Sequence, residues 1–189
     1  MFCHLTPRPR NAEATRAAIL NAARERFARE SYDDVGMRDI AGDVGVDAAL
    51  VSRYFGSKEE LFVAVMDSCE NGAELMSGDR ADFGARIAHD IVFQPESDTK
   101  LVGLLILLRS IGSAKAMELV QRTGNERFFT PFSQWVGGPD AAVRARLAAG
   151  FIMGMSVSRE ITGGFGLDKA QCQQMRDRMA AILQDLIDR

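Results

Sequence analysis

The 189-residue sequence has few of the residues that build disulfide frameworks or zinc sites, because it contains only three cysteines and two histidines. The cysteines, Cys3, Cys69 and Cys172, are odd in number and form no C-x-x-C pair, which argues against both kinds of site. We therefore expect no metal, no cofactor and a reducing, cytoplasmic compartment. Cys69 and Cys172 are expected to fill small spaces in the core.

Long apolar runs are also missing. The longest, Leu101–Leu108, is far shorter than the roughly 20 residues that a membrane span needs, and the opening residues MFCHLTPRPR contain no apolar signal-peptide core. We expect a cytoplasmic chain with no membrane partner. The net charge of −3 gives no general attraction to nucleic acid. Residues 1–29 differ, with six arginines against two glutamates, which fits either a basic arm beside DNA or a solvated tail.

Apolar residues recur at helical spacing along the chain and no alternating strand pattern occurs, so the sequence predicts an all-α fold. Helices are expected over 12–29, 37–44, 47–55, 57–75, 83–91, 101–111, 140–161 and 168–187, with another that starts after Ser113 and bends near Thr130 and Pro131. The segment 101–111 is apolar nearly all round, so we expect it at the centre of a C-terminal domain.

Met37–Phe55 has the pattern of a helix-turn-helix. Gly45 makes a turn between two short helices, Asp47 is a preferred N-cap for the second, and Ser57–Glu60 is a capping box for the helix that follows. This architecture places a second helix in the major groove of DNA. Apolar or small residues fill the interior positions that the motif requires, namely Ile40, Ala41, Val44, Val46, Val51 and Tyr54.

Residues 27–62, FARESYDDVGMRDIAGDVGVDAALVSRYFGSKEELF, resemble the DNA-binding part of the tetracycline-repressor (TetR) family. The shared features are a first helix that ends in Phe, R-D-I-A in the second, G-V before the third, and aromatic-Phe-x-Ser-Lys-Glu-x-Leu-Phe at the entry to the fourth. The resemblance implies an N-terminal DNA-binding domain over 1–58 and a helical effector-binding and dimerisation domain over 59–189. It also implies a homodimeric repressor that a small apolar or amphipathic effector releases from a palindromic, double-stranded operator.

The same resemblance implies which residues meet DNA. Arg38 and Asp47–Leu50 would face the base edges, where Arg38 can fork to guanine and Ala48, Ala49 and Leu50 can touch thymine methyls. Two positions depart from the family, with Gly36 or Met37 where Thr or Ser is common and Ser52 in place of a Tyr. Arg53, or Arg8 and Arg10 in the minor groove, could replace the lost contacts. The expected phosphate contacts are Ser52, Arg53, Tyr54 and Lys58.

The C-terminal half offers candidates for a dimer interface and a pocket, each of which could instead be ordinary core. Small residues at four-residue spacing and a seam of apolar residues at spacings of three and four both suit helix pairing. A palindromic operator also requires two reading heads. The interface candidates are Gly150, Gly154, Ser158, Met175, Met179, Ile182 and Leu186. The pocket candidates are Met66, His89, Leu105, Arg109, Phe132 and Phe151.

Two other classes of function remain as alternatives. A nucleoid-associated or architectural protein could use the same helix-turn-helix without effector control. An enzyme would need a catalytic constellation, but His89 and Asp90 have no recognisable nucleophile or metal partner, and Ser156 and Ser158 lack the G-x-S-x-G context. We therefore expect a DNA-binding protein that is not an enzyme.

Overall fold

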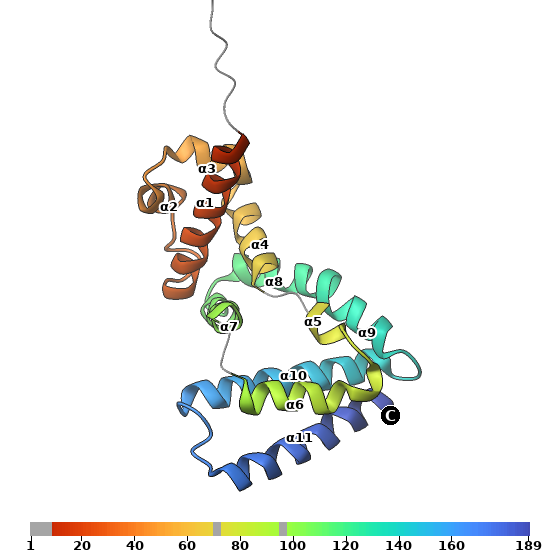
Figure 1. The fold of residues 1–189 in the computed structure, drawn as a ribbon. Helices are drawn as coiled ribbons and strands as arrows, with labels where there is room; N and C mark the ends of the chain where they lie inside the picture. The colour runs from red at the N-terminus through yellow and green to blue at the C-terminus, as the bar shows by residue number, and fades with distance from the viewer. Residues whose placement is uncertain (1–8, 70–72, 95–97) are drawn as a thin grey trace, which may run out of the picture. The chain divides into compact units, whose positions relative to one another are not determined.

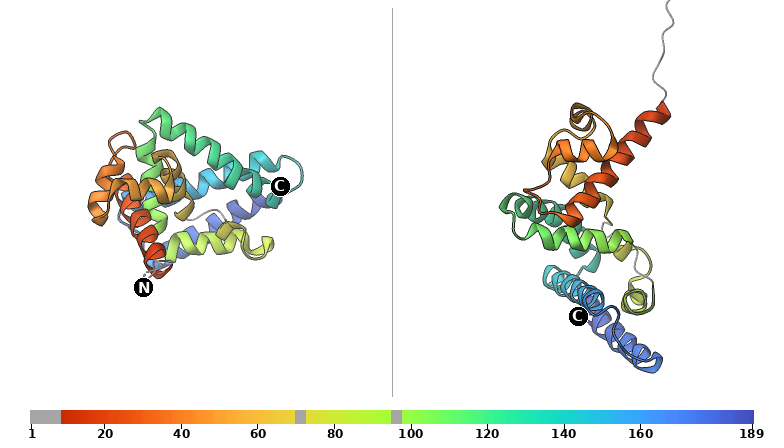
Figure 2. Two further views of the ribbon diagram at one scale, coloured as in Figure 1. Left: turned by 90° about the horizontal axis from the view of Figure 1, so that it is seen from above. Right: turned by 90° about the vertical axis from the view of Figure 1, so that its left-hand side faces the viewer.

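The computed structural model describes residues 9–69, 73–94 and 98–189, and helices are the only regular secondary structure in these three ranges (Figure 1). The chain divides into two compact units, which we describe separately. The first unit comprises Met1–Cys69 and Asp98–Gln121, and the second comprises Glu70–Ser97 and Arg122–Arg189. Each unit therefore draws on two separate stretches of sequence. Figure 2 gives two further views of the chain, coloured by residue number.

The first unit holds the predicted helix-turn-helix. Helix α1 contacts α2, α4 and α7, while α3 packs against α2 and α4. Three aromatic side chains form the centre of its core: the rings of Phe27, Tyr32 and Phe62 lie 5.0 to 5.9 Å apart. Its helices are α1 (Pro9–Arg29), α2 (Met37–Val44), α3 (Ala48–Phe55), α4 (Lys58–Ser68), α7 (Asp98–Ser110) and α8 (Ala114–Gly124), which ends just beyond the unit.

The second unit is built around α6, α10 and α11, which lie side by side (Figure 1). The approach of α6 to α11 is close because Gly84 has no side chain: a Cβ there would lie 2.2 Å from the carbonyl oxygen of Ala180. The Gly84 N–H donates to Gln184 Oε1 at 2.9 Å across the same contact. The helices are α5 (Ala73–Met76), α6 (Phe83–Phe93), α9 (Thr130–Val136), α10 (Ala141–Ile161) and α11 (Lys169–Asp188).

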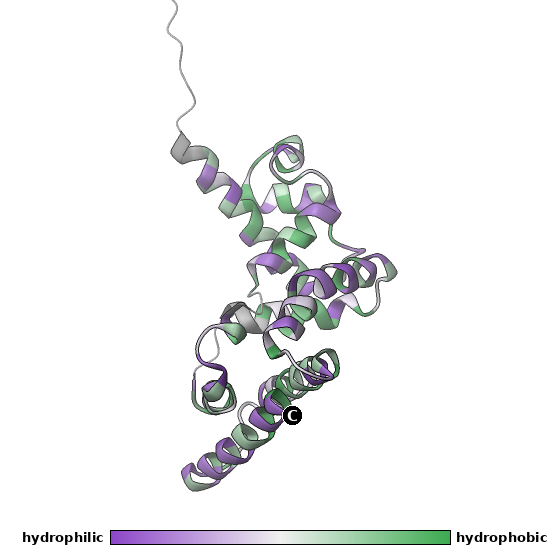
Figure 3. Cartoon of the chain, turned by 90° about the vertical axis from the view of Figure 1, so that its right-hand side faces the viewer, coloured by the Kyte–Doolittle hydropathy of each residue, from purple (hydrophilic) through white to green (hydrophobic). Residues whose placement is uncertain are grey.

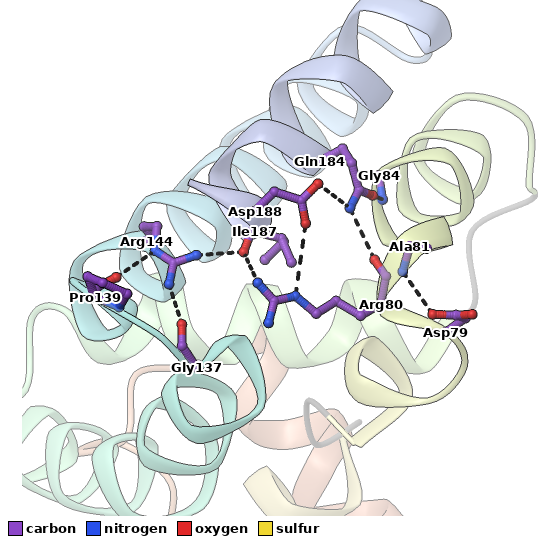
Figure 4. A network of polar contacts seen from close by, with 10 residues as sticks. All are labelled: Asp79, Arg80, Ala81, Gly84, Gly137, Pro139, Arg144, Gln184, Ile187 and Asp188. Carbon is purple, nitrogen blue, oxygen red and sulfur yellow. Dashed lines mark hydrogen bonds and ion pairs between the residues drawn. The ribbon is translucent and has the colours of Figure 1, made fainter.

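Two arginines hold the C-terminal end of α11. The guanidinium of Arg144 is buried and donates to the carbonyl oxygens of Ile187 at 2.5 Å, Pro139 at 3.1 Å and Gly137 (Figure 4). Arg80 Nη2 donates to the same Ile187 oxygen at 2.5 Å. Cations near the C-terminus of a helix stabilise its unpaired carbonyl groups. Arg144 is thus a structural residue that joins the ends of α9 and α11.

The predicted bend near Pro131 is a π-helical turn, Asn125–Phe129, that joins α8 to α9. Its widened bond runs from the Thr130 N–H to the Asn125 carbonyl. Proline has no N–H and its ring crowds the carbonyl four residues before it, so a regular α-helix cannot continue through this point. The extra residue in the turn accommodates Pro131 without ending the helix.

Two expectations from the sequence are wrong. Helix α4 ends at Ser68 and does not continue to residue 75; the Ser68 hydroxyl donates to the Val65 carbonyl, and Cys69 already leaves the helical conformation. Helix α7 belongs to the first unit, where it packs on α1, and is not at the centre of a separate C-terminal domain. The expected limits of α10 and α11 are confirmed, including the N-cap Asp168.

Candidate nucleic-acid interface

The helix-turn-helix begins at Gly36, one of the two residues that the sequence offered for the cap of α2. Gly36 occupies the N-cap of α2, where the family commonly has Thr or Ser. The Gly36 N–H donates to Asp39 Oδ2 at 3.0 Å. Asp39 therefore supplies one of the capping bonds of α2, and its carboxylate is held against the backbone.

A fork between Arg26 of α1 and Asp43 of α2 links the first helix to the motif. Arg26 Nε and Nη2 donate to the two carboxylate oxygens at 2.6 and 2.9 Å, and Nη1 also pairs with Glu30. The hydrogen bond from Arg26 holds the pKa of the Asp43 carboxyl below its usual value. Bidentate pairs of this kind hold both partners in a defined geometry.

The turn between α2 and α3 requires a left-handed residue. Gly45 has φ 72° and ψ 34°, a conformation that residues with a Cβ rarely adopt. The Val46 N–H donates to the Ala41 carbonyl at 3.0 Å, which closes the end of α2. Of the six interior residues that the motif requires, Ile40, Ala41 and Val51 are buried in the core of the first unit. Val44, Val46 and Tyr54 are half-buried against this core.

The predicted contact residues of α3 are divided between its exposed side and its half-buried flanks. Asp47 caps it, with Oδ1 accepting from the Ala49 N–H at 2.7 Å. Ala49, Ser52 and Arg53 are exposed, and the guanidinium of Arg53 lies 5.7 Å from the ring centre of Tyr54. The remaining predicted residues of the helix, Ala48, Leu50 and Tyr54, are half-buried, and Arg38 on α2 is exposed.

Lys58 does not extend freely from the start of α4. Its ammonium lies 4.4 Å from the ring centre of Tyr32 and 3.5 Å from the Asp33 carbonyl oxygen. Glu60 Oε2 accepts from the Ser57 N–H at 2.8 Å, and Ser57 Oγ accepts from the Glu60 N–H at 3.2 Å. The pKa of Glu59 is lowered, chiefly by a hydrogen bond from its own backbone N–H. The N–H groups of Ser57 and Glu60 are therefore engaged within the capping box and are not free to bind a phosphate.

One cation beside the motif was missed from the sequence. The guanidinium of Arg16 lies 4.7 Å from the ring centre of Phe55, which places a positive charge at the C-terminal end of α3. In the sequence, Arg16 is recognisable only as one of several arginines on the solvent-exposed face of the first helix. Of the expected arm residues, Arg8 and the side chain of Arg10 lie outside the described residues.

The six pocket candidates are divided between the two units. Met66, Leu105 and Arg109 are in the first, and His89, Phe132 and Phe151 are in the second. Arg109 Nε donates to the Ala28 carbonyl at 2.7 Å, so this guanidinium braces α7 against the end of α1. Phe132 is fully buried among the rings of Phe83, Phe128 and Trp135, whereas His89 is exposed beside Phe93.

The interface candidates lie on α10 and α11. Gly150, Gly154 and Ser158 are exposed, and a Cβ added to either glycine would meet nothing within 4 Å. Large apolar side chains on α10 are exposed as well, namely Val143, Leu147, Met153 and Ile161. On α11, Ile182 is exposed and Met175 and Leu186 are half-buried. Met179 is only 3% exposed in the core of its own unit, so it can add almost nothing to an interface.

Both helices carry apolar and polar residues along their length (Figure 3). Leu167, Met175 and Ile182, with the polar residues Gln171, Gln174 and Arg178, line a hollow on the surface of α11. Among the described residues, no helix has the length and apolar character needed to cross a membrane.

Sequence profiles match both parts of the chain. The family described as "Bacterial regulatory proteins, tetR family" matches residues 19–65, and "Tetracyclin repressor-like, C-terminal domain" matches residues 81–187. RaaS, an HTH-type transcriptional regulatory protein of Mycobacterium tuberculosis, is 37% identical over 120 residues, which are 60% of this chain and 54% of RaaS. The matched part thus spans about half the length of this curated relative.

Solved structures share the fold at low sequence identity. NalD, the secondary repressor of the MexAB-OprM multidrug efflux pump in Pseudomonas aeruginosa, aligns with a TM-score of 0.65 at 20% identity, covering 90% of this chain and 95% of NalD. A transcriptional regulator from Saccharomonospora viridis, solved in complex with choline, aligns with a TM-score of 0.57 at 20% identity over 91% of this chain and 96% of its own. With both domain profiles matched and the fold shared, the chain belongs to the TetR family of transcriptional regulators, which are DNA-binding regulatory proteins, usually repressors, and not enzymes.

Proposed function

We propose that this chain is a homodimeric repressor that binds an inverted-repeat operator and that a small apolar or amphipathic effector releases it. The observation that carries the DNA-binding part is the exposed side of α3, where Ala49, Ser52 and Arg53 stand clear of the core that holds the helix. Arg38 adds an exposed guanidinium from α2. Residues 1–58 would read the operator, and residues 59–189 would bind the effector and the second copy in the cytoplasm.

Phosphate contacts in this proposal come chiefly from three exposed groups, with the half-buried Tyr54 beside them. Arg53 and Ser52 lie on α3, and Arg16 adds a cation at the end of the same helix. Lys58 would contribute only after leaving the ring of Tyr32, so we expect a smaller effect from its loss than from the loss of Arg53. Each phosphate that a cation neutralises makes the slope of log affinity against log salt more negative by about 0.9.

The homodimer is supported by the apolar, exposed side of α10. Leu147 is 54% exposed and Val143 is 58% exposed, which is unusual for large aliphatic side chains on one helix. Gly150 and Gly154 on the same helix would allow a second backbone to approach closely. An operator with two half-sites about 34 Å apart requires two reading heads, which a two-fold dimer supplies.

Effector release requires a route from the ligand-binding part to the reading head. Two hydrogen bonds in the first unit provide one: Arg109 Nε to the Ala28 carbonyl, and Ser113 Oγ to Asp33 Oδ1 at 3.0 Å. Asp33 lies in the loop immediately before α2, so a displacement of α7 and α8 would reach the motif through these bonds. The effector must bind better to the conformation that holds the two heads at the wrong spacing. Support for a small ligand comes from the choline complex of the Saccharomonospora viridis regulator.

The proposal is tested by selecting duplexes from a random pool with the full-length protein and measuring their binding by fluorescence anisotropy. We expect an inverted repeat to be enriched and its scrambled version to bind only weakly. Arg53→Ala should weaken binding to all enriched duplexes alike, whereas Arg176→Ala, which removes a cation from α11, should not. A pool that yields no shared sequence would refute sequence-specific binding.

The effector part needs its own measurement. A library of small amphipathic molecules is added to the preformed protein–duplex complex, and release of the labelled duplex is followed. Release by one chemical class supports induction. If the protein instead occupies many genomic sites and no compound releases it, the result would indicate an architectural DNA-binding protein.

A further inference from the structure

The first turn of the reading helix is aliphatic. Ala48, Ala49 and Leu50 occupy it, with Ala49 exposed and its two neighbours half-buried. The N-terminal residues of the second helix are those that contact base edges in a helix-turn-helix. An alanine methyl has no donor or acceptor, so it cannot read the hydrogen-bonding pattern of a base pair. The one apolar group that the major groove presents is the C5 methyl of thymine.

The carboxylates near this tip each have a partner within the protein. Asp47 Oδ1 accepts from the Ala49 N–H at 2.7 Å, Asp39 Oδ2 accepts from the Gly36 N–H at 3.0 Å, and Asp43 is held by both nitrogens of the Arg26 fork. Carboxylates are the usual acceptors for the N4 amino group of cytosine. None of these three carboxylates belongs to the first turn of α3, so the turn itself offers cytosine no side-chain acceptor.

Two polar side chains of the motif have no side-chain partner within the described ranges. These are Arg38 on α2 and Ser52 in the second turn of α3. Arg38 suits the two acceptors of guanine. Neither side chain lies in the first turn of α3, so the aliphatic turn is left to a different kind of contact.

We propose that Ala48 and Ala49 read the C5 methyl of a pyrimidine in each operator half-site, so that binding depends on thymine there and responds to 5-methylation of cytosine at that position. This inference rests on the proposed DNA-binding function and specifies the chemistry that the reading helix recognises. Thymine and 5-methylcytosine carry the same methyl group at the same place in the major groove. A cytosine at that position would gain the contact only when methylated.

The test uses the best duplex recovered by selection, with each thymine replaced in turn by uracil, which removes only the methyl group. Burying one such group contributes a factor of about four in affinity per half-site, or about fifteen when both half-sites are changed. We expect one thymine per half-site to show this loss. Replacing that thymine–adenine pair by cytosine–guanine should weaken binding, and 5-methylcytosine should bind about fourfold more tightly than cytosine at the same position.

A variant shows whether Ala49 makes the contact. Ala49→Gly removes the methyl group from the protein side, so the preference for thymine over uracil should largely disappear. Ala85→Gly, at an exposed alanine in the first turn of α6, is the matched control for the loss of helix propensity and should retain the full preference.

Thermal unfolding of both variants excludes loss of the fold as the cause. Enriched duplexes that bind equally well with thymine or uracil at every position would overturn the methyl-reading proposal while leaving sequence-specific binding intact. Failure to enrich any sequence would instead refute the underlying function. A thymine preference that Ala49→Gly retains in full would also overturn the assignment to this residue.

Discussion

A charged residue at Leu147 should separate the proposed dimer. Complete burial of a leucine side chain contributes roughly 1.5 to 3 kcal/mol, and Leu147 still exposes 54% of its surface. Its remaining area therefore contributes about 1 kcal/mol per copy on association. A two-fold interface counts each substitution twice, so Leu147→Asp should cost about 2 kcal/mol from lost apolar burial alone. That loss corresponds to a dimer dissociation constant about thirtyfold higher.

The unpaired carboxylates of Leu147→Asp increase this cost, because each would lose water without gaining a partner. Sedimentation equilibrium measures the dissociation constant directly. The matched control is Leu108→Asp, since Leu108 is a similarly exposed leucine, at 45%, on α7 in the other unit. We expect the control to remain as dimeric as the unsubstituted protein. A Leu147→Asp protein that dimerises with unchanged affinity would refute the assignment of the interface to this side of α10.

Four further predictions concern the reading head and the fold. Arg38→Ala should cost about 1 to 3 kcal/mol at one base pair and relax specificity there, as measured on a set of singly substituted duplexes; equal weakening on every duplex would make Arg38 a phosphate contact. The pKa of Asp43 is lowered by its arginine partner, so this pair stabilises the fold above the ordinary carboxyl pKa and loses its contribution as the pH falls through the lowered value. The stability difference between the unsubstituted protein and Asp43→Asn, measured by urea unfolding, should therefore shrink in acid, and a difference independent of pH would contradict this account. Burial, together with the nearby carboxylates, raises the pKa of Tyr32 to about 12, so the neutral phenol stabilises the fold up to the ordinary tyrosine pKa and this contribution is lost as the pH rises toward 12. The ultraviolet absorbance of tyrosinate should show a late ionisation that Tyr32→Phe removes, and an unchanged titration curve would count against it. Gly84→Ala should lower the free energy of unfolding by about 1 to 3 kcal/mol, because its Cβ would lie 2.2 Å from a carbonyl oxygen of α11. The control in this denaturation experiment is Gly112→Ala, where a Cβ meets nothing within 4 Å. Equal stabilities of the two variants would show that α6 and α11 can move apart at no cost.

Local signals made the helix-turn-helix predictable. The caps at Asp47 and Ser57 and the turn at Gly45 depend on residues within a few positions of one another, and each lies where the sequence places it. Helical limits with good caps, such as that of α11 at Asp168, were predictable for the same reason. Hydrogen bonds between near neighbours need no knowledge of the rest of the chain.

The location of the apolar helix α7 was not predictable in the same way. Its apolar residues on all sides indicate that the helix is buried, but they do not indicate which helices pack against it. The structure places it on α1, where Arg109 reaches a carbonyl 81 residues earlier in the chain. The pocket interpretation of Arg109 had only its position at the end of an apolar helix to support it, and its partner lies too far away in sequence for any periodic pattern to reveal.

The sequence alone determined the class of the protein, its helical content and the limits of α3, because capping, turn conformation and amphipathic spacing are local properties. Tertiary structure alone decided which charges are free and which apolar residues are exposed. Asp43 is engaged by a residue 17 positions away, Met179 is buried, and Leu147 is exposed. These outcomes depend on how separate helices pack, since burial and long-range pairing arise only when distant segments meet.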